Sequence, residues 1–162
     1  MRGPILAGAG LLLSASLAMA AGAQSPKTFI KNAIEGDNGE IQIGQLVQQK
    51  GGSQAVRQFG DMLATDHTKA KQQAEAVAGQ LGVEPPGGLK AEVQKEMQKL
   101  QGLSGAAFDK EVARYSVKDH EKDIATFRAQ AKSGNGPASQ LAEKQLPVLE
   151  KHLKAARALP SK

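Results

Sequence analysis

Hydrophobic residues recur at steps of three and four along most of the chain that follows Pro26. This spacing places apolar side chains on one face of a helix, whereas strict alternation of apolar and polar residues would indicate strands. Four long segments carry the helical pattern, and they cover residues of about 26–49, 53–82, 104–133 and 137–159. A shorter amphipathic segment covers residues 89–100. The pattern therefore predicts an all-α protein.

The connections between these segments predict how the helices are arranged. Short loops join the first segment to the second and the third to the fourth, so each pair is expected to be antiparallel. The connection of about 21 residues between the second and third segments, 83–103, is long enough to carry the chain from one end of a bundle to the other. We therefore expect a ferritin-like four-helix bundle with a crossover connection that carries a short extra helix. A plain up-down bundle with a decorated loop is the alternative.

Two features interrupt the helical pattern. A glycine inside a helix costs about 1 kcal/mol relative to alanine, and the first segment contains several helix-breaking residues, namely Gly36, Asn38, Gly39 and Gly44. One interpretation is two short helices joined by a turn, and the other is a single helix kept slim so that a neighbour can approach closely. In the last segment, Pro147 removes a backbone hydrogen bond and is expected to kink the helix.

The first 23 residues have the features of a secretory signal peptide. Arg2 precedes an apolar run at about residues 5–19, and two A-x-A patterns that end at Ala20 and Ala23 close the run. We expect cleavage after Ala23, with Ala20 as the alternative site. An uncleaved membrane anchor is the other interpretation, but the run is shorter than the roughly 20 strongly apolar residues that a span needs. The prediction is an exported protein, with the bacterial periplasm as first choice, and a single mature domain over residues 24–162.

Composition narrows the possible functions. The chain of 162 residues has a formal net charge of +5, no Cys, no Trp, one Tyr and four Phe. Without cysteine it has no disulfide framework, zinc finger or thiol nucleophile, and export with few aromatic residues argues against nucleic acid as a partner. No segment of the mature chain is apolar enough to cross a bilayer. The mild positive charge could favour weak contact with anionic envelope surfaces, and no protein partner is indicated.

The three histidines of the chain carry the clearest chemical signal. His67, His120 and His152 each fall on the apolar face of a different long helix, about 14 to 16 residues from its start. Residues near the middle of bundled helices share one layer whichever way each helix runs, because every residue advances a helix by about 1.5 Å. Glu40 lies at a similar height in the first segment. The sequence therefore predicts that three imidazoles and one carboxylate meet at the bundle centre.

Such a set of side chains is suited to a metal ion. Three imidazoles and a carboxylate form a tetrahedral ligand set for Zn²⁺, and imidazole also binds Cu or Fe. Asp66 and Asp119 each directly precede one of the histidines and point about 100° away from it, so they could orient a histidine of a neighbouring helix as hydrogen-bond acceptors. The alternative is a metal-free polar layer in which the histidines, Glu40 and the two aspartates satisfy one another.

Other kinds of chemistry are not indicated. Ferritin-like di-iron sites use Glu-x-x-His on two helices, but the residues three before each histidine are not ligands, being Ala64, Val117 and Leu149. The chain has no Ser or Cys nucleophile motif, no glycine-rich phosphate loop and no H-E-x-x-H sequence. We therefore assign no catalytic residue and no organic cofactor. A mononuclear site and a protein that is not an enzyme are favoured.

Several short motifs resemble one family of exported proteins. They are N-G-E-I-Q-I-G-Q-L at 38–46, Phe59 with M-L-A-T-D-H at 62–67, Phe108-Asp109, V-K-D-H at 117–120, and L-P-V-L at 146–149 followed by His152-Leu153. In their order and spacing over residues of about 28–159, these motifs resemble the domain-of-unknown-function family DUF4142. Val112 departs from the pattern, because the family often places an aromatic residue there.

The resemblance implies a ferritin-like helical bundle of bacterial envelopes whose activity is not established. Recurrent positions of the family match Glu40, His67, His120 and His152, the residues that periodicity also selects. Two functions remain open. The first is an exported bundle that binds one metal ion through these four residues. The second is a non-enzymatic envelope or stress-associated interaction protein whose histidines form a metal-free polar layer.

Overall fold

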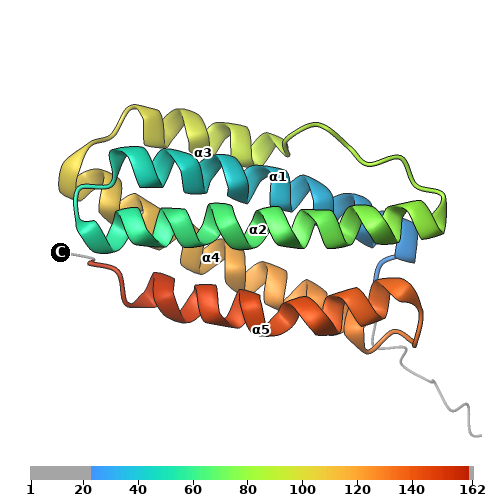
Figure 1. Cartoon of the computed structure of the whole chain (residues 1–162). Helices are drawn as coiled ribbons and strands as arrows, with labels where there is room; N and C mark the ends of the chain where they lie inside the picture. Colours follow the sequence, from blue (N-terminus) through green and yellow to red (C-terminus); the bar gives the residue numbers. More distant parts are fainter. Residues whose placement is uncertain (1–22, 161–162) are drawn as a thin grey trace, which may run out of the picture.

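The computed structural model describes residues 23–160 and contains five α-helices. They are α1 (Pro26–Lys50), α2 (Gln54–Leu81), α3 (Ala91–Gln101), α4 (Gly105–Ala131) and α5 (Pro137–Arg157). This part of the chain has no strand, so the predicted all-α class is confirmed (Figure 1). Each helix begins and ends within two residues of the segment that the hydrophobic pattern predicts. The predicted signal peptide, apart from its last residue, lies outside the described residues.

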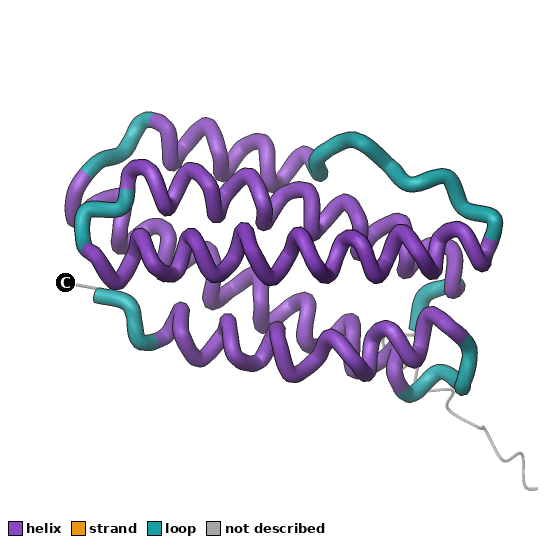
Figure 2. The backbone as a smooth tube through the Cα atoms, viewed as in Figure 1, coloured by secondary structure: helices purple, strands orange, loops and turns teal. Residues whose placement is uncertain are grey.

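Four long helices form the bundle, and a crossover runs along its length. α1 packs against α2, and α4 against α5, each as an antiparallel pair joined by a short loop. After α2 the chain returns to the opposite end of the bundle through residues 82–90 and α3, so α4 begins at the same end as α2 and runs in the same direction (Figure 2). This is the predicted crossover with a short extra helix. The plain up-down alternative is wrong, because it would make α4 antiparallel to α2.

Polar contacts tie the loop between α1 and α2 to α4. Ser53 caps α2, since its Oγ accepts a hydrogen bond from the backbone amide of Val56 at 3.2 Å. Asp109 of α4 accepts hydrogen bonds from the amides of Gly52 and Ser53, at 2.7 and 3.1 Å. These bonds hold the two helix pairs at a fixed height relative to each other, which the central site requires.

Gly44 of α1 allows a close contact with α2, and the glycines of α1 do not form a turn. α1 continues without a break through residues 36–39. A Cβ at Gly44 would lie 2.7 Å from backbone atoms of Gly60 and Ala64 in α2, and a Cβ at Gly60 would lie 2.4 Å from the backbone nitrogen of Gln48. There is no room for a side chain at either position, so the two backbones touch. The interpretation as one slim helix is confirmed, and the two-helix interpretation is wrong.

A polar layer divides the hydrophobic core into two clusters. The first cluster takes residues from the early part of α1, the late parts of α2 and α4 and most of α5, among them Phe29, Ile34, Ala78, Phe127 and Leu141. The second takes residues from the late part of α1, the early parts of α2 and α4 and the end of α5, among them Val47, Phe59, Leu63, Phe108 and Ala156. The three histidines lie between the clusters, at the predicted middle height of the bundle.

Helix α5 runs unbroken through Pro147, which lies on its exposed side. Because proline has no amide hydrogen, the carbonyl of Glu143 receives no helical hydrogen bond from this position. The helix nevertheless continues past His152 to Arg157. The kink expected at the proline stays a prediction.

Candidate metal centre

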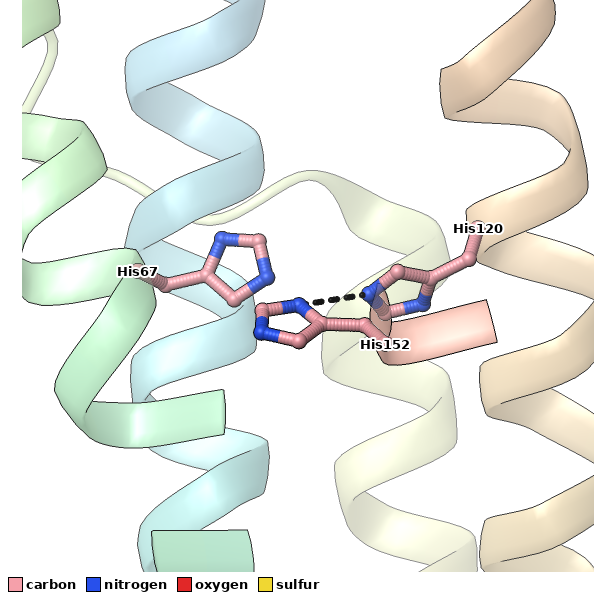
Figure 3. A group of neighbouring side chains, drawn as sticks. All are labelled: His67, His120 and His152. Atoms are coloured by element: carbon pink, nitrogen blue, oxygen red, sulfur yellow. Dashed lines mark hydrogen bonds between the residues drawn. The ribbon is translucent and has the colours of Figure 1, made fainter. Parts of the chain in front are cut away.

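Three helices bring the three histidines together at the centre of the bundle. His67 comes from α2, His120 from α4 and His152 from α5. One ring nitrogen of each lies within 4.8 Å of those of the other two (Figure 3). The residues are 4%, 1% and 0% exposed, so all three side chains are buried. The structure thus places the three imidazoles in one layer, as the helical spacing predicts.

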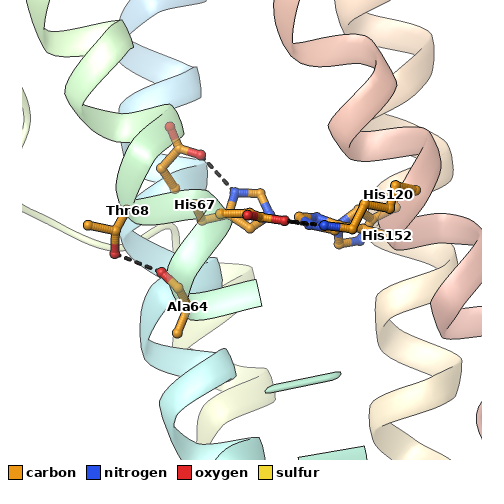
Figure 4. Close-up of polar contacts among 8 residues, drawn as sticks. Ala64, His67, Thr68, His120 and His152 are labelled. Carbon is orange, nitrogen blue, oxygen red and sulfur yellow. Dashed lines mark hydrogen bonds and ion pairs between the residues drawn. The ribbon is translucent and has the colours of Figure 1, made fainter. Parts of the chain in front are cut away.

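A carboxylate of α1 forms a hydrogen bond with His67 on the side of the ring that faces away from the other two histidines. Its Nδ1 atom lies 2.8 Å from Oδ1 of Asp37, which is itself buried (Figure 4). When the carboxylate is ionised it only accepts, so the hydrogen of the imidazole stands on Nδ1. The Nε2 atom of His67 is buried and has no hydrogen-bond partner within residues 23–160. Its lone pair is then free to face the other two rings.

The other two histidines are held from behind in the same manner. Nδ1 of His120 lies 2.9 Å from the backbone carbonyl oxygen of Ser116, one helical turn earlier. Nε2 of His152 lies 3.1 Å from Oδ2 of Asp66, which also accepts a hydrogen bond from Lys151 at 2.7 Å. The remaining nitrogens, Nε2 of His120 and Nδ1 of His152, face each other at 3.3 Å (Figure 3).

The positions of the ring N–H hydrogens determine whether a cation can bind at the centre of this cluster. A neutral imidazole carries one hydrogen, and with Asp37 and Asp66 ionised all three hydrogens point outward to acceptors. Three lone pairs then converge, which is unfavourable without a cation between them. In a metal-free protein, a protonated Asp37 would donate a hydrogen bond to Nδ1 of His67. The ring hydrogen of His67 would then be on Nε2, which faces the other two histidines. The same side chains therefore support a metal site and, with one more proton, a polar layer.

Burial keeps all three imidazoles neutral at pH 7. It lowers the pKa of His67 and of His152 to about 4. Burial, with the neighbouring imidazoles, lowers the pKa of His120 to about 3. Neutral imidazole is the form that binds a metal ion, because its lone pair is free. At neutral pH the rings therefore do not have to lose a proton to bind a cation.

Glu40 lies apart from the histidine group. It is not one of the residues whose donor atoms all lie within 4.8 Å of one another. The residue is 3% exposed, and neither carboxylate oxygen has a hydrogen-bond partner within the described part of the chain. Burial, and then the negative charge of Asp119, raises the pKa of Glu40 well above its usual range. Glu40 is therefore not one of the grouped donor residues, which are the three histidines alone within the described part of the chain.

The residues behind the histidines differ in part from those that the sequence singles out. Asp66 reaches a histidine of a neighbouring helix, whereas Asp119 forms no hydrogen bond with a histidine within residues 23–160. Sequence reasoning missed Asp37 and the carbonyl of Ser116. Asp37 could have been found, because it lies three residues before Glu40 on the same face of α1. A backbone carbonyl has no signature in the residue types.

The fold and the site define this protein as an all-α bundle with a buried three-histidine cluster at its centre. A family described as a domain of unknown function (DUF4142) matches residues 12–159, and the chain belongs to this family. The motifs at Glu40, His67, His120 and His152 indicated the same family. No curated protein and no solved structure matches the chain.

Proposed function

We propose that this protein binds one divalent metal ion between His67, His120 and His152. The observation that supports the proposal most directly is the orientation of the rings. Each imidazole has one nitrogen on an outer acceptor, and its other nitrogen faces the other two histidines. Metal-binding histidines are oriented in this way, because a carboxylate or carbonyl behind the ring fixes the tautomer and makes the inner nitrogen a stronger ligand.

The spacing of the nitrogens is compatible with a small ion. In a tetrahedral zinc site with Zn–N bonds of about 2.1 Å, the ligand nitrogens are about 3.4 Å apart. Nε2 of His120 and Nδ1 of His152 are 3.3 Å apart, and the donor atom of His67 lies within 4.8 Å of those of the other two histidines. Three protein ligands leave a fourth position for water or another molecule. Zn²⁺ is the first ion to test, followed by Cu and Fe.

We further propose that the protein is exported, with the bacterial periplasm as its compartment. The support comes from the N-terminal sequence, in which Arg2, an apolar run and small residues at Ala20 and Ala23 follow one another. Within residues 23–160, no helix combines the length and the apolar character needed to cross a bilayer. A site made of imidazoles also needs no cysteine, which suits a chain without one in an oxidising compartment.

Metal analysis of the mature protein, purified without an affinity tag, tests the proposal. We expect about one ion per chain, and a thermal midpoint that falls when a chelator removes the ion. His120→Ala is expected to lose both the ion and the response to chelator. Gln130→Ala is the matched control, because Gln130 is an equally buried polar residue of α4 that is not part of the histidine group. This variant is expected to keep the ion.

The alternative function gives a different result in the same experiment. A folded protein without bound metal, whose thermal midpoint responds neither to chelator nor to added Zn²⁺, Cu²⁺ or Fe²⁺, would show that the histidines form a metal-free polar layer. The function would then lie on the surface, in an envelope or stress-associated interaction.

A further inference from the structure

A cavity of about 380 Å³ lies beside the histidine group. This volume falls within the range of small-molecule pockets, which is about 300–1,000 Å³. Of the three histidines, His67 lines the cavity, and Asp37 and Asp66 line it with His67. A molecule bound there would therefore lie next to the candidate metal centre without replacing any of its ligands.

The inner walls of the cavity are mainly apolar. Phe29 of α1 and Phe127 of α4 both line it, and their rings meet edge to face with centroids 4.9 Å apart. Ala33 of α1 and Leu149 of α5, both buried, extend the apolar surface. Such walls favour a ligand with an aromatic or branched apolar body. When such a ligand binds, apolar surface of both the ligand and the protein is removed from contact with water.

Lysines supply the charge around this apolar surface. Lys69 of α2 and Lys144 of α5 line the cavity and are exposed, so they mark its outer edge. Lys90, the residue before α3, lines it and is half-buried. None of these three lysines forms an ion pair with another residue of the described chain. They form a group, here called the unpaired lysines. Lys90 lies near enough to Asp37 and Asp123 to oppose the rise in the pKa of both carboxyl groups, so the charge most available to a ligand is that of Lys69 and Lys144.

The lining also holds four acidic residues, Asp37, Asp66, Glu92 and Asp123. Glu92 is bound to Lys122, at 2.7 Å, and Asp66 is bound to Lys151, at 2.7 Å. Asp123 also lines the cavity, and burial with the nearby Asp119 raises its pKa to about 7, so part of it is neutral at that pH. Asp37, the most deeply buried of the four, is bound to His67. At the exposed edge, the charge that is free of an ion-pair partner within the described residues is that of Lys69 and Lys144.

We propose that this cavity binds a small organic anion. An aromatic or branched apolar body would lie against Phe29 and Phe127, and a carboxylate, sulfonate or similar group would lie among the unpaired lysines. The inference does not rest on the proposed metal site, because the cavity and its lysines are complete without an ion.

Two fluorescent probes test the inference on the metal-free mature protein. They are anilinonaphthalene sulfonate and phenylnaphthylamine, which carries the same rings without the charged group. We expect one sulfonate molecule per chain, bound about tenfold more tightly than the neutral probe. Replacing both exposed lysines, with Lys69→Gln and Lys144→Gln, is expected to weaken sulfonate binding about tenfold and to leave the neutral probe unchanged. Lys154→Gln, an exposed lysine of α5 outside the lining, is the control and changes neither.

A second variant tests the place of binding. Ala70 of α2 lines the cavity, so Ala70→Trp is expected to fill it and to abolish binding of both probes in a protein whose circular dichroism shows it to be folded. If this variant does not fold, the sulfonate affinity of the variant with both Lys69→Gln and Lys144→Gln tests the proposal. Equal affinity for the two probes, a sulfonate affinity that the lysine substitutions do not change, or binding that survives in folded Ala70→Trp would overturn the proposal. A failure to bind metal would leave these results unaffected.

Discussion

Nε2 of His120 lies 3.3 Å from Nδ1 of His152, and each ring donates the hydrogen of its other nitrogen to an acceptor behind it. With neutral rings and an ionised Asp66, no hydrogen remains for the contact between them, so two lone pairs face each other. A buried acceptor without a donor costs about 1–3 kcal/mol. A cation between the two rings would remove this cost, and His67 would offer it a third ligand.

Removing the carboxylate behind His152 is expected to weaken metal binding. In Asp66→Ala, the ring of His152 loses the acceptor that fixes its tautomer and orientation. Substitutions of this kind typically cost about 10–100-fold in metal affinity. Competition against a coloured chelator measures the affinity for Zn²⁺. Asp61→Ala is the control, because Asp61 is an exposed residue of α2 whose side chain contacts Gln48 and no histidine. Equal affinities in both variants would contradict a supporting role for Asp66.

Metal binding near pH 7 is expected to release about one proton from the pair formed by Asp37 and His67. Burial raises the pKa of Asp37 well above its usual range, which favours an extra proton there in the metal-free protein. When an ion takes Nε2 of His67, Nδ1 donates to an ionised Asp37 and the extra proton leaves. Calorimetric titration in two buffers with different ionisation enthalpies counts the protons released.

Asp37→Asn separates this proton from any other source. The asparagine oxygen can still accept the hydrogen of Nδ1, but the side chain cannot ionise. We therefore expect this variant to release about one proton fewer than the unaltered protein on binding the same ion. An identical proton count in the two proteins would show that Asp37 does not lose a proton.

The histidines of the metal-free protein are expected to weaken the fold as the pH falls from about 6.5 towards 4. Burial lowers the pKa of His67 and His152 to about 4, whereas histidine in the unfolded chain titrates at about 6.5. The unfolded state therefore takes up protons first, and each histidine weakens the fold by up to about 1.4 kcal/mol per pH unit in this window. The raised pKa values of Asp37, Glu40 and Asp123 act in the opposite direction, since the folded state binds these protons more tightly. The contribution of a histidine is therefore read from the difference in slope between the unaltered protein and a histidine variant.

Urea unfolding at several pH values, with chelator present, measures this dependence. His67→Gln is expected to reduce the slope by the contribution of one histidine, because glutamine does not titrate. Gln145→Ala is the control, since it removes a buried polar side chain that does not titrate either. A slope that is the same in all three proteins would contradict the assignment of the pH dependence to the histidines.

The contact between α1 and α2 is expected to tolerate no side chain at Gly60. A Cβ there would lie 2.4 Å from the backbone nitrogen of Gln48 and 2.6 Å from the carbonyl oxygen of Gly44, so the helices must separate. We expect Gly60→Ala to lower the free energy of unfolding by roughly 2–3 kcal/mol. Gly79→Ala in the same helix has open space around it and is expected to raise it by about 1 kcal/mol. Unfolding in urea checks both, and a neutral Gly60→Ala would contradict the close contact.

The helices and their order could be predicted because this information is local. Apolar steps of three and four, the serine before α2 and the left-handed Gly82 at its end are all visible in the residue types. The layer of histidines could be predicted as well, since His67, His120 and His152 lie at matching distances from the starts of their helices. Short loops that connect antiparallel pairs then fix the relative height.

The partners of the histidines could not be predicted in the same way. Asp37 and Glu40 share one face of α1, and which of them meets His67 depends on the rotation and axial shift of α1 against α2. The close contact at Gly44 and Gly60 sets both quantities. In this structure Asp37 contacts Nδ1 of His67, whereas the carboxylate oxygens of Glu40 have no hydrogen-bond partner within the described residues. Differences of a few ångströms of this kind are not encoded in a hydrophobic pattern.

Titration of the metal-free mature protein with Zn²⁺, followed by calorimetry, tests the central claim most directly. The account predicts one ion per chain, and loss of that binding in each of three single variants, His67→Ala, His120→Ala and His152→Ala, while Gln130→Ala retains it. A folded protein that takes up no stoichiometric ion, or that binds one ion which none of the three histidine substitutions removes, would contradict the account.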